Sequence, residues 1–224
     1  ASSSSLLASV LIGKEKYPFV FILGNLEEAG YFYHDLVQLL GEEKVLFFPS
    51  SFRRAIKYGQ KDAANEILRT EVLSRLQKQE KGLCIVTYPD ALAEKVVSQQ
   101  ELQEKTLKLF QGDRVDMQFV VDVLREFNFE FVDYVYEPGQ YAVRGSIIDV
   151  FSFSSEYPYR IDFFGDEIES LRTFEVQSQL SKEKRNDVVI VPDLSRGLSK
   201  QGGNLISFLD FLSADTILAM RDFL

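Results

Sequence analysis

The sequence predicts an α/β fold, in which a three-layer domain built on a parallel sheet carries an inserted antiparallel α+β domain. Up to residue 105, apolar strands alternate with helices, which is the pattern of a parallel sheet with right-handed crossovers. Beyond residue 105, strand-like segments follow one another with only turns between them, which is typical of an antiparallel meander. A chain of 224 residues has room for one large domain or two modest ones.

The first part of the chain contains three apolar runs that are predicted to be buried strands of the parallel sheet. Uninterrupted apolar runs of this length are expected where a strand is covered on both faces. Between the runs, apolar residues recur at helical spacing, and serines before the first helix can cap it. The predicted strands are residues 17–23, 45–49 and 83–87, and the predicted helices are residues 6–12, 27–40 and 63–79.

The inserted part is predicted to contain one amphipathic helix, residues 115–127, followed by four strand-like segments. These segments are residues 131–136, 141–151, 159–164 and 168–174. The apolar run Val188–Val191 is then predicted to return to the parallel sheet. The resulting domains are residues 1–105, the inserted residues 106–187, and residues 188–224, which rejoin the first domain.

Composition is that of an ordinary folded, soluble protein, with 46% hydrophobic and 26% charged residues. The formal net charge of −9 argues against nucleic acid as the first partner, because phosphate binding depends on clustered Lys and Arg. Cys84 is the single cysteine and has apolar neighbours, so we expect a buried thiol, a reducing compartment and a cytoplasmic location. No apolar run approaches the ~20 residues that span a bilayer.

Nucleotide binding is not expected, although a parallel α/β domain commonly hosts nucleoside triphosphates. The Gly-x-x-x-x-Gly-Lys-Ser/Thr motif is absent. The pair Gly13-Lys14 lies after an apolar helix rather than after a strand, and Ser2–Ser5 lack the lysine that reaches the outer phosphates. We therefore expect no cofactor in this chain.

Catalytic and metal sites are not expected either. His34 is the one histidine and lies in a predicted helix, which excludes sites that need several histidines. An acidic cluster surrounds a predicted hairpin turn, but strand alternation separates such side chains onto opposite faces, so a solvated hairpin end is the simpler interpretation. The cluster consists of Asp162, Asp166, Glu167 and Glu169.

The strand Tyr159–Phe164 is the most informative segment. Its period of two directs Arg160, Asp162 and Phe164 to one face and the apolar remainder to the other. If the apolar set is core, Phe164 and the Arg160 guanidinium project together into solvent, the composition of a protein-interface anchor. The alternative is that Phe164 packs under the hairpin turn and Arg160 pairs with Asp162. Periodicity leaves undecided whether Arg144 shares this face.

Two dense motifs in this region carry a family resemblance. They are Gly-x-Tyr-x-x-Arg-Gly-x-x-x-Asp-x-Phe at residues 139–151 and Arg-Ile-Asp-Phe-Phe-Gly-Asp-Glu-Ile-Glu-Ser at residues 160–170. The chain closely resembles the module shared by the excinuclease subunit UvrB and the bacterial transcription-repair coupling factor, Mfd. UvrB-like chains carry an intact phosphate-binding loop and a long aromatic hairpin, and this sequence has neither. It looks like the N-terminal, UvrB-like portion of the coupling factor.

This resemblance implies a degenerate NTPase-like first domain, with Ser2–Ser5 as the relic of its phosphate loop, and an inserted domain that binds UvrA in nucleotide excision repair. The UvrA-binding residues that it implies are Arg144, Arg160 and Phe164. The full-length family is an ATP-dependent DNA translocase that displaces stalled RNA polymerase, and its ATP/Mg²⁺, polymerase and double-stranded DNA sites lie in domains absent from these residues. The alternative is a UvrB-like, DNA-damage-binding ATPase fragment.

Overall fold

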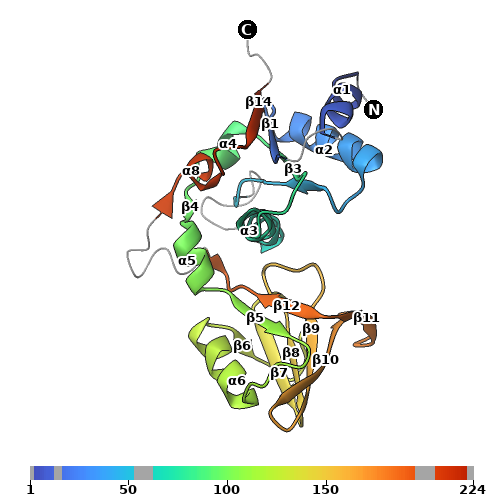
Figure 1. The fold of residues 1–224 in the computed structure, drawn as a ribbon, viewed down its shortest axis with the longest axis vertical. Coiled ribbons are helices and arrows are strands. Elements are labelled where there is room, and N and C mark those ends of the chain that lie inside the picture. The colour runs from blue at the N-terminus through green and yellow to red at the C-terminus, as the bar shows by residue number, and fades with distance from the viewer. Residues whose placement is uncertain (1–2, 13–16, 53–62, 195–204, 221–224) are drawn as a thin grey trace. The chain divides into compact units, whose positions relative to one another are not determined.

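The computed structural model describes residues 3–12, 17–52, 63–194 and 205–220. The chain divides into two compact units (Figure 1). Unit 1 contains Ala1–Gln99 and Gly203–Leu224, and unit 2 contains Gln100–Gly202. The fold is mixed α/β: unit 1 is built on a parallel sheet and unit 2 on a mainly antiparallel one.

The sheet of unit 1 has four parallel strands in the order β14-β1-β3-β2. Three of them are the strands predicted from the apolar runs, and each contributes fully buried residues such as Val20, Val45 and Ile85. A separate two-stranded antiparallel pair joins β4 to β13. The strands are β1 (Phe19–Ile22), β2 (Val45–Phe47), β3 (Cys84–Thr87), β4 (Val96–Val97), β13 (Leu205–Ile206) and β14 (Ile217–Met220).

Two long helices contact opposite faces of this sheet. On one face, the ring of Phe47 in β2 packs against Tyr33 of α2, with 5.3 Å between the ring centroids. The ring of Phe21 in β1 packs against Phe32 of the same helix, with 5.2 Å between the centroids. The next residue, Phe48, points the other way and lies under Arg69 of α3, with 4.2 Å from Cζ to the ring centroid. The helices of unit 1 are α1 (Ser3–Ile12), α2 (Leu26–Leu40), α3 (Ala63–Gln77), α4 (Pro89–Leu92) and α8 (Phe208–Phe211). The helix α5 (Gln99–Glu104) belongs to unit 2 except for its first residue.

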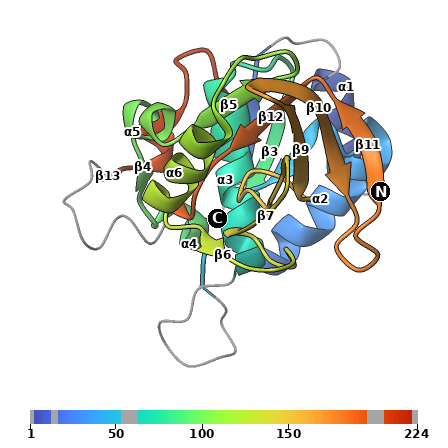
Figure 2. The ribbon, with the colours of Figure 1, turned by 90° about the horizontal axis from the view of Figure 1, so that it is seen from below.

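Unit 2 contains a six-stranded sheet in the order β11-β10-β9-β8-β7-β6. All its pairs are antiparallel except β6 with β7. Figure 2 shows α6 on one side of these strands, with β11 at the outer edge beside β10. The elements are α6 (Met117–Glu126), β6 (Glu130–Phe131), β7 (Gln140–Arg144), β8 (Ile147–Val150), β9 (Tyr159–Phe164), β10 (Glu167–Phe174) and β11 (Ser181–Arg185).

One face of this sheet, the inner face, forms the core of unit 2. Tyr141, Ile148 and Ile161 on the sheet pack with Val120 and Leu124 of α6 in one buried cluster. The helix begins at Asp116, whose side chain accepts a hydrogen bond from the backbone N–H of Gln118 at 2.8 Å. The opposite, outer face is therefore where exposed side chains of the strands gather.

The prediction that Val188–Val191 return to the parallel sheet is wrong. This run forms β12 (Asp187–Ile190), which pairs antiparallel with β5 (Leu107–Phe110), and Val188 and Ile190 join the core of unit 2. The strand that joins the parallel sheet after unit 2 is β14. A continuous apolar run indicates burial on both faces but does not identify the neighbouring strand.

The predicted strand over residues 141–151 is also wrong, because the segment is a hairpin. It forms β7 and β8, with Arg144 opposite Ile147 across a two-residue turn at Gly145-Ser146. Gly145 has a φ of +58°, which glycine adopts at little cost. Of the strand predicted over residues 131–136, only Phe131 belongs to a strand of the sheet, β6, which begins one residue earlier at Glu130.

None of the helices in the described ranges has the length and apolarity needed to cross a membrane.

Candidate protein-binding site

Strand register brings the three predicted site residues to the outer face of unit 2. Arg160 is directly opposite Asp149, and Asp162 is opposite Ile147, which is itself opposite Arg144. Residues directly opposite each other in neighbouring strands share a face, so Arg144 lies on the same face as Arg160 and Phe164. The question that periodicity left open is settled by the turn at Gly145-Ser146.

Asp149 joins the two arginines. Its side chain is 1% exposed, and its carboxylate accepts hydrogen bonds from Arg160 Nε at 2.7 Å and from Arg160 Nη2 at 2.9 Å. Arg144 Nη2 also donates to Asp149 Oδ2. A buried carboxylate needs charged partners and hydrogen bonds to offset its desolvation, and here two guanidinium groups, the arginine pair Arg144 and Arg160, supply both.

Arg160 does not project into solvent as predicted, because its side chain is only 14% exposed. Besides its two bonds to Asp149, it donates from Nη1 to the Gln179 carbonyl at 3.1 Å and lies over the Phe174 ring, 4.6 Å from its centroid. Hydrogen bonding to Asp149 raises the pKa of the Arg160 guanidinium, although burial partly opposes this. Its position is fixed by neighbours that strand alternation cannot reveal.

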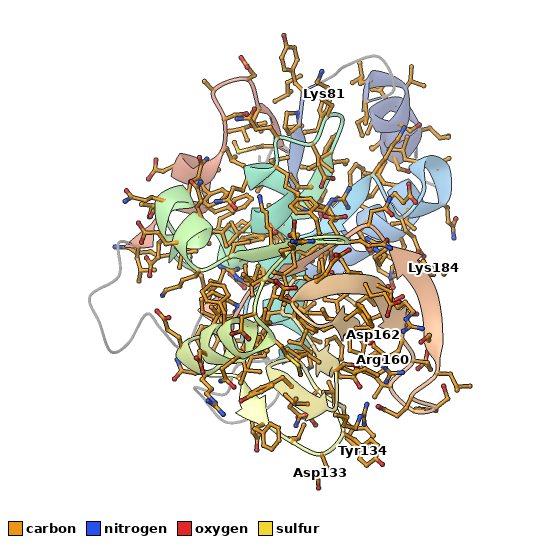
Figure 3. All side chains as sticks on the ribbon, turned by 60° about the horizontal axis from the view of Figure 1, so that its bottom comes forward. Lys81, Asp133, Tyr134, Arg160, Asp162 and Lys184 are labelled. Carbon is orange, nitrogen blue, oxygen red and sulfur yellow. The ribbon has the colours of Figure 1, made fainter. Side chains whose placement is uncertain are left out.

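Arg144 is the more accessible of the pair, with 36% of its side chain exposed. Its Cζ lies 5.0 Å from the centroid of the Tyr134 ring, within cation–π range. Arg144 Nη1 also donates to the Asp133 carbonyl at 3.4 Å. Figure 3 labels Asp133, Tyr134, Arg160 and Asp162 on unit 2.

Phe164 confirms the predicted strand alternation. The burial of β9 alternates along its length, with Tyr159, Ile161 and Phe163 buried, whereas Phe164 is 78% exposed. Phe164 is the last residue of the strand and is opposite Glu167 across the turn at Gly165-Asp166. The alternative, in which Phe164 packs under this turn and Arg160 pairs with Asp162, is therefore excluded.

Part of the outer face is covered. Val135, Ala142, Phe151 and Phe174 form a second buried cluster there, which two loops, residues 132–139 and 175–180, complete. The arginine pair lies next to this cluster, and Phe164 lies beyond it at the end of β9. The outer face thus presents one partly exposed cation, Arg144, and one exposed ring, Phe164, while Arg160 is largely covered.

The acidic cluster at the β9–β10 hairpin shows no metal-site geometry. Arg172 Nη2 donates to Asp162 Oδ2 at 3.2 Å, and Asp166, Glu167 and Glu169 are exposed. Across the described ranges, no group of three or more His, Cys, Asp or Glu side chains could hold a metal ion.

Among the residues considered for phosphate binding in unit 1, those that the structure describes lie near carboxylates. Gly13-Lys14 and Ser2 fall outside the described residues. Ser5 is buried and donates from its hydroxyl to Asp35 Oδ2 at 2.8 Å. A hollow of about 510 Å³ beside β1 and α2 includes the carboxylates of Glu28 and Asp35 in its lining.

Sequence reasoning missed Asp149 as the residue that organises the arginine pair. A signal was available, because Gly145-Ser146 between apolar flanks is a hairpin turn that places Arg144 beside Asp149 on the next strand. No sequence pattern predicts that Phe174 and Gln179 contact Arg160, since both reach it through tertiary packing.

A buried arginine–carboxylate network and an exposed aromatic ring on one face are features typical of the class of protein-interaction domains. Comparison with known proteins supports this class: residues 107–195 match the UvrB interaction domain family. The chain is also related over most of its length to transcription-repair-coupling factors, as its two motifs predict.

The coupling factor of Bacillus subtilis is 28% identical over 96% of this chain. That of Haemophilus influenzae is 32% identical over 68% of the chain, and that of Escherichia coli is 36% identical over 55%. These matches cover 19%, 13% and 11% of the respective relatives, so the chain spans a fifth or less of their length.

Proposed function

We propose that this chain is a non-catalytic protein-binding module that recruits UvrA in transcription-coupled nucleotide excision repair. The observation that carries the proposal is Phe164, a phenylalanine that is 78% exposed on the same face as the arginine pair, within the segment that matches the UvrB interaction domain. Aromatic and arginine side chains are the types enriched at binding hot spots. A partner that covers this ring removes apolar surface from water, which favours binding.

The proposal extends to the longer protein of which this module is typical. Since the relatives are coupling factors and about five times as long as the chain, we place the ATP-dependent DNA translocase, with its sites for RNA polymerase and double-stranded DNA, in parts beyond these residues. A cytoplasmic location belongs to the same proposal, in line with one buried thiol and no disulfide partner.

The rival function, a UvrB-like ATPase fragment, is less well supported. The sequence lacks the Gly-x-x-x-x-Gly-Lys-Ser/Thr motif that binds the phosphates of a nucleoside triphosphate. In the serine segment that would be its relic, the Ser5 hydroxyl donates to the Asp35 carboxylate, and a negative charge there disfavours a phosphate. We therefore expect a fluorescent ATP analogue with Mg²⁺ not to bind saturably, and saturable binding would favour the rival.

The direct test is capture of purified UvrA by the immobilised chain. We expect Phe164→Ala to abolish most of the capture, because the loss of a hot-spot aromatic costs about 2 kcal/mol or more, or roughly 30-fold in affinity. Phe119→Ala is the control, since Phe119 is 53% exposed on α6, which packs against the inner face. Equal capture by the parent and by folded Phe164→Ala would refute the proposal.

A further inference from the structure

Two loops beside the arginine pair carry exposed aromatic or apolar side chains, which are Tyr134 and Tyr136 in one loop and Leu180 in the other. Tyr134, in loop 132–139, is 52% exposed, and Leu180, in loop 175–180, is 69% exposed. Neither lies on a strand of the sheet, and neither belongs to the motifs that carry the family resemblance. Both loops nevertheless belong to the same outer face, because Val135 and Val176 pack in its second buried cluster.

Loop 132–139 is fastened on both sides of Tyr134. The following residue, Val135, is fully buried, and the preceding residue, Asp133, accepts a hydrogen bond from Arg144 through its carbonyl. The Arg144 guanidinium then lies against the Tyr134 ring itself. Tyr134 is thus exposed and yet held in place, which lowers the entropy lost when a partner covers it.

Loop 175–180 is fastened by Gln179, directly before Leu180. Its carbonyl accepts from Arg160, and its side-chain Nε2 donates to the carbonyls of Val176 at 2.7 Å and Val135 at 3.2 Å. Gln179 adopts a φ of +58°, a conformation that non-glycine residues take only where their surroundings impose it. The two loops are therefore tied to each other and to the arginine pair.

The centre of this arrangement favours a negatively charged group. Asp149 is the buried carboxylate that both arginines share, so one of their two positive charges is unmatched by it. Each guanidinium has five N–H donors, more than the contacts to Asp149, Asp133 and Gln179 use. Arg144, at 36% exposure, can present such donors to a carboxylate from outside.

We propose that Tyr134 and Leu180 are contact residues of the same interface as Phe164, and that the partner inserts an acidic side chain, flanked by apolar ones, against Arg144. The inference rests on the proposed function and names the chemistry of its partner. Apolar side chains around a charged centre exclude water from it, which is the arrangement found around binding hot spots.

The test is the affinity of purified UvrA for Tyr134→Ala and Leu180→Ala variants. Both side chains are exposed, so the variants are expected to fold like the parent and to bind about tenfold more weakly. Phe119→Ala, at matched exposure on α6, is expected to bind like the parent. If both loop variants bind like the parent while Phe164→Ala binds weakly, this inference fails and the proposed function stands. If Phe164→Ala also binds like the parent, the proposed function fails.

Two further measurements test whether the partner places an acidic side chain against Arg144, and whether the partner is UvrA rather than a second copy of this chain. Added NaCl is expected to weaken binding of the parent, and Arg144→Gln is expected to reduce that salt dependence. An unchanged salt dependence would overturn the proposed contact between Arg144 and an acidic side chain of the partner.

Sedimentation of the chain alone is expected to give the same mass for the parent and for Tyr134→Ala. A dimer that this substitution dissociates would overturn the inference by assigning the surface to a second copy.

Discussion

Asp149 is the residue on which the geometry of the outer face depends. It is almost fully buried, and its carboxylate fixes both Arg144 and Arg160. Removing one partner of a buried ion pair leaves uncompensated charge in a low-dielectric environment, which costs more than the pair contributes when intact. We therefore expect the loss of this one carboxylate to lower stability and, if the outer face is the binding site that we propose, affinity as well.

Asp149→Asn is expected to destabilise unit 2 by about 3 kcal/mol, because two guanidinium groups lose their shared counter-ion. UvrA affinity should fall with it, since neither arginine is held in position. Urea unfolding measures the first effect. The matched control is Asp162→Asn, whose pair with Arg172 is 24% and 30% exposed and whose loss should cost less than about 1 kcal/mol. Equal destabilisation by the two substitutions would contradict the role of Asp149.

Cys84 gives a prediction that depends on pH. Burial raises the pKa of its thiol to about 12, from an ordinary value of 9.0. Above pH 9.0 the unfolded chain releases this proton while the folded chain retains it, so the contribution to stability is complete below pH 9.0 and is lost as the pH rises toward 12.

The free energy of unfolding should therefore fall between about pH 7.5 and about pH 10.5 by more in the parent than in Cys84→Ala. The difference between the two proteins should grow by roughly 1.4 kcal/mol for each pH unit above the ordinary pKa of the thiol. The comparison removes the contributions of other titrating groups, which both proteins share. A parallel fall in the two proteins would mean that the thiol is not protected in the folded state.

At the scale of elements, the β7–β8 hairpin is what creates the site. The turn at Gly145-Ser146 reverses the chain so that Arg144 and Asp149, five positions apart in the sequence, meet on one face. Gly145 has open space where a Cβ would lie, but its φ of +58° disfavours any other residue. The turn depends on glycine for its backbone conformation and not for close packing.

Gly145→Ala is accordingly expected to destabilise the protein by about 1 kcal/mol, through left-handed strain alone. Gly30→Ala is the informative control, because Gly30 lies inside α2 and also has open space at the Cβ position. That substitution should stabilise the protein by up to about 1 kcal/mol, because alanine favours helix. Urea unfolding shifts of the same sign for both variants would contradict the assignment.

Elements were predictable from sequence where local pattern decides them. The runs at 17–23, 45–49 and 83–87 contain β1, β2 and β3 of the parallel sheet, and the alternation in Tyr159–Phe164 matches the burial of β9. The run at Val188–Val191 was placed in the wrong sheet, because apolar character specifies burial but not the neighbouring strand. The apolar pattern of segment 141–151 predicts one strand, whereas the left-handed conformation of Gly145 turns the chain there and makes a hairpin.

For the whole molecule, the change from parallel to antiparallel pairing along the chain is visible in the sequence. Strand alternation gives the face on which Phe164 lies, and the structure shows that its ring is exposed there. The burial of Arg160 did not follow, because Phe174 and the Gln179 loop that cover it come from other parts of unit 2. Alternation gives the face on which a side chain lies, whereas tertiary packing determines how much of it a partner can reach.

The central claim is that the outer face of unit 2 binds UvrA through Phe164. A binding isotherm of the chain against purified UvrA, recorded for the parent and for Phe164→Ala at the same ionic strength, tests it most directly. We predict saturable one-to-one binding by the parent and an affinity about 30-fold lower for the variant. Absence of binding by the parent, or superimposable isotherms for the two proteins, would contradict the claim.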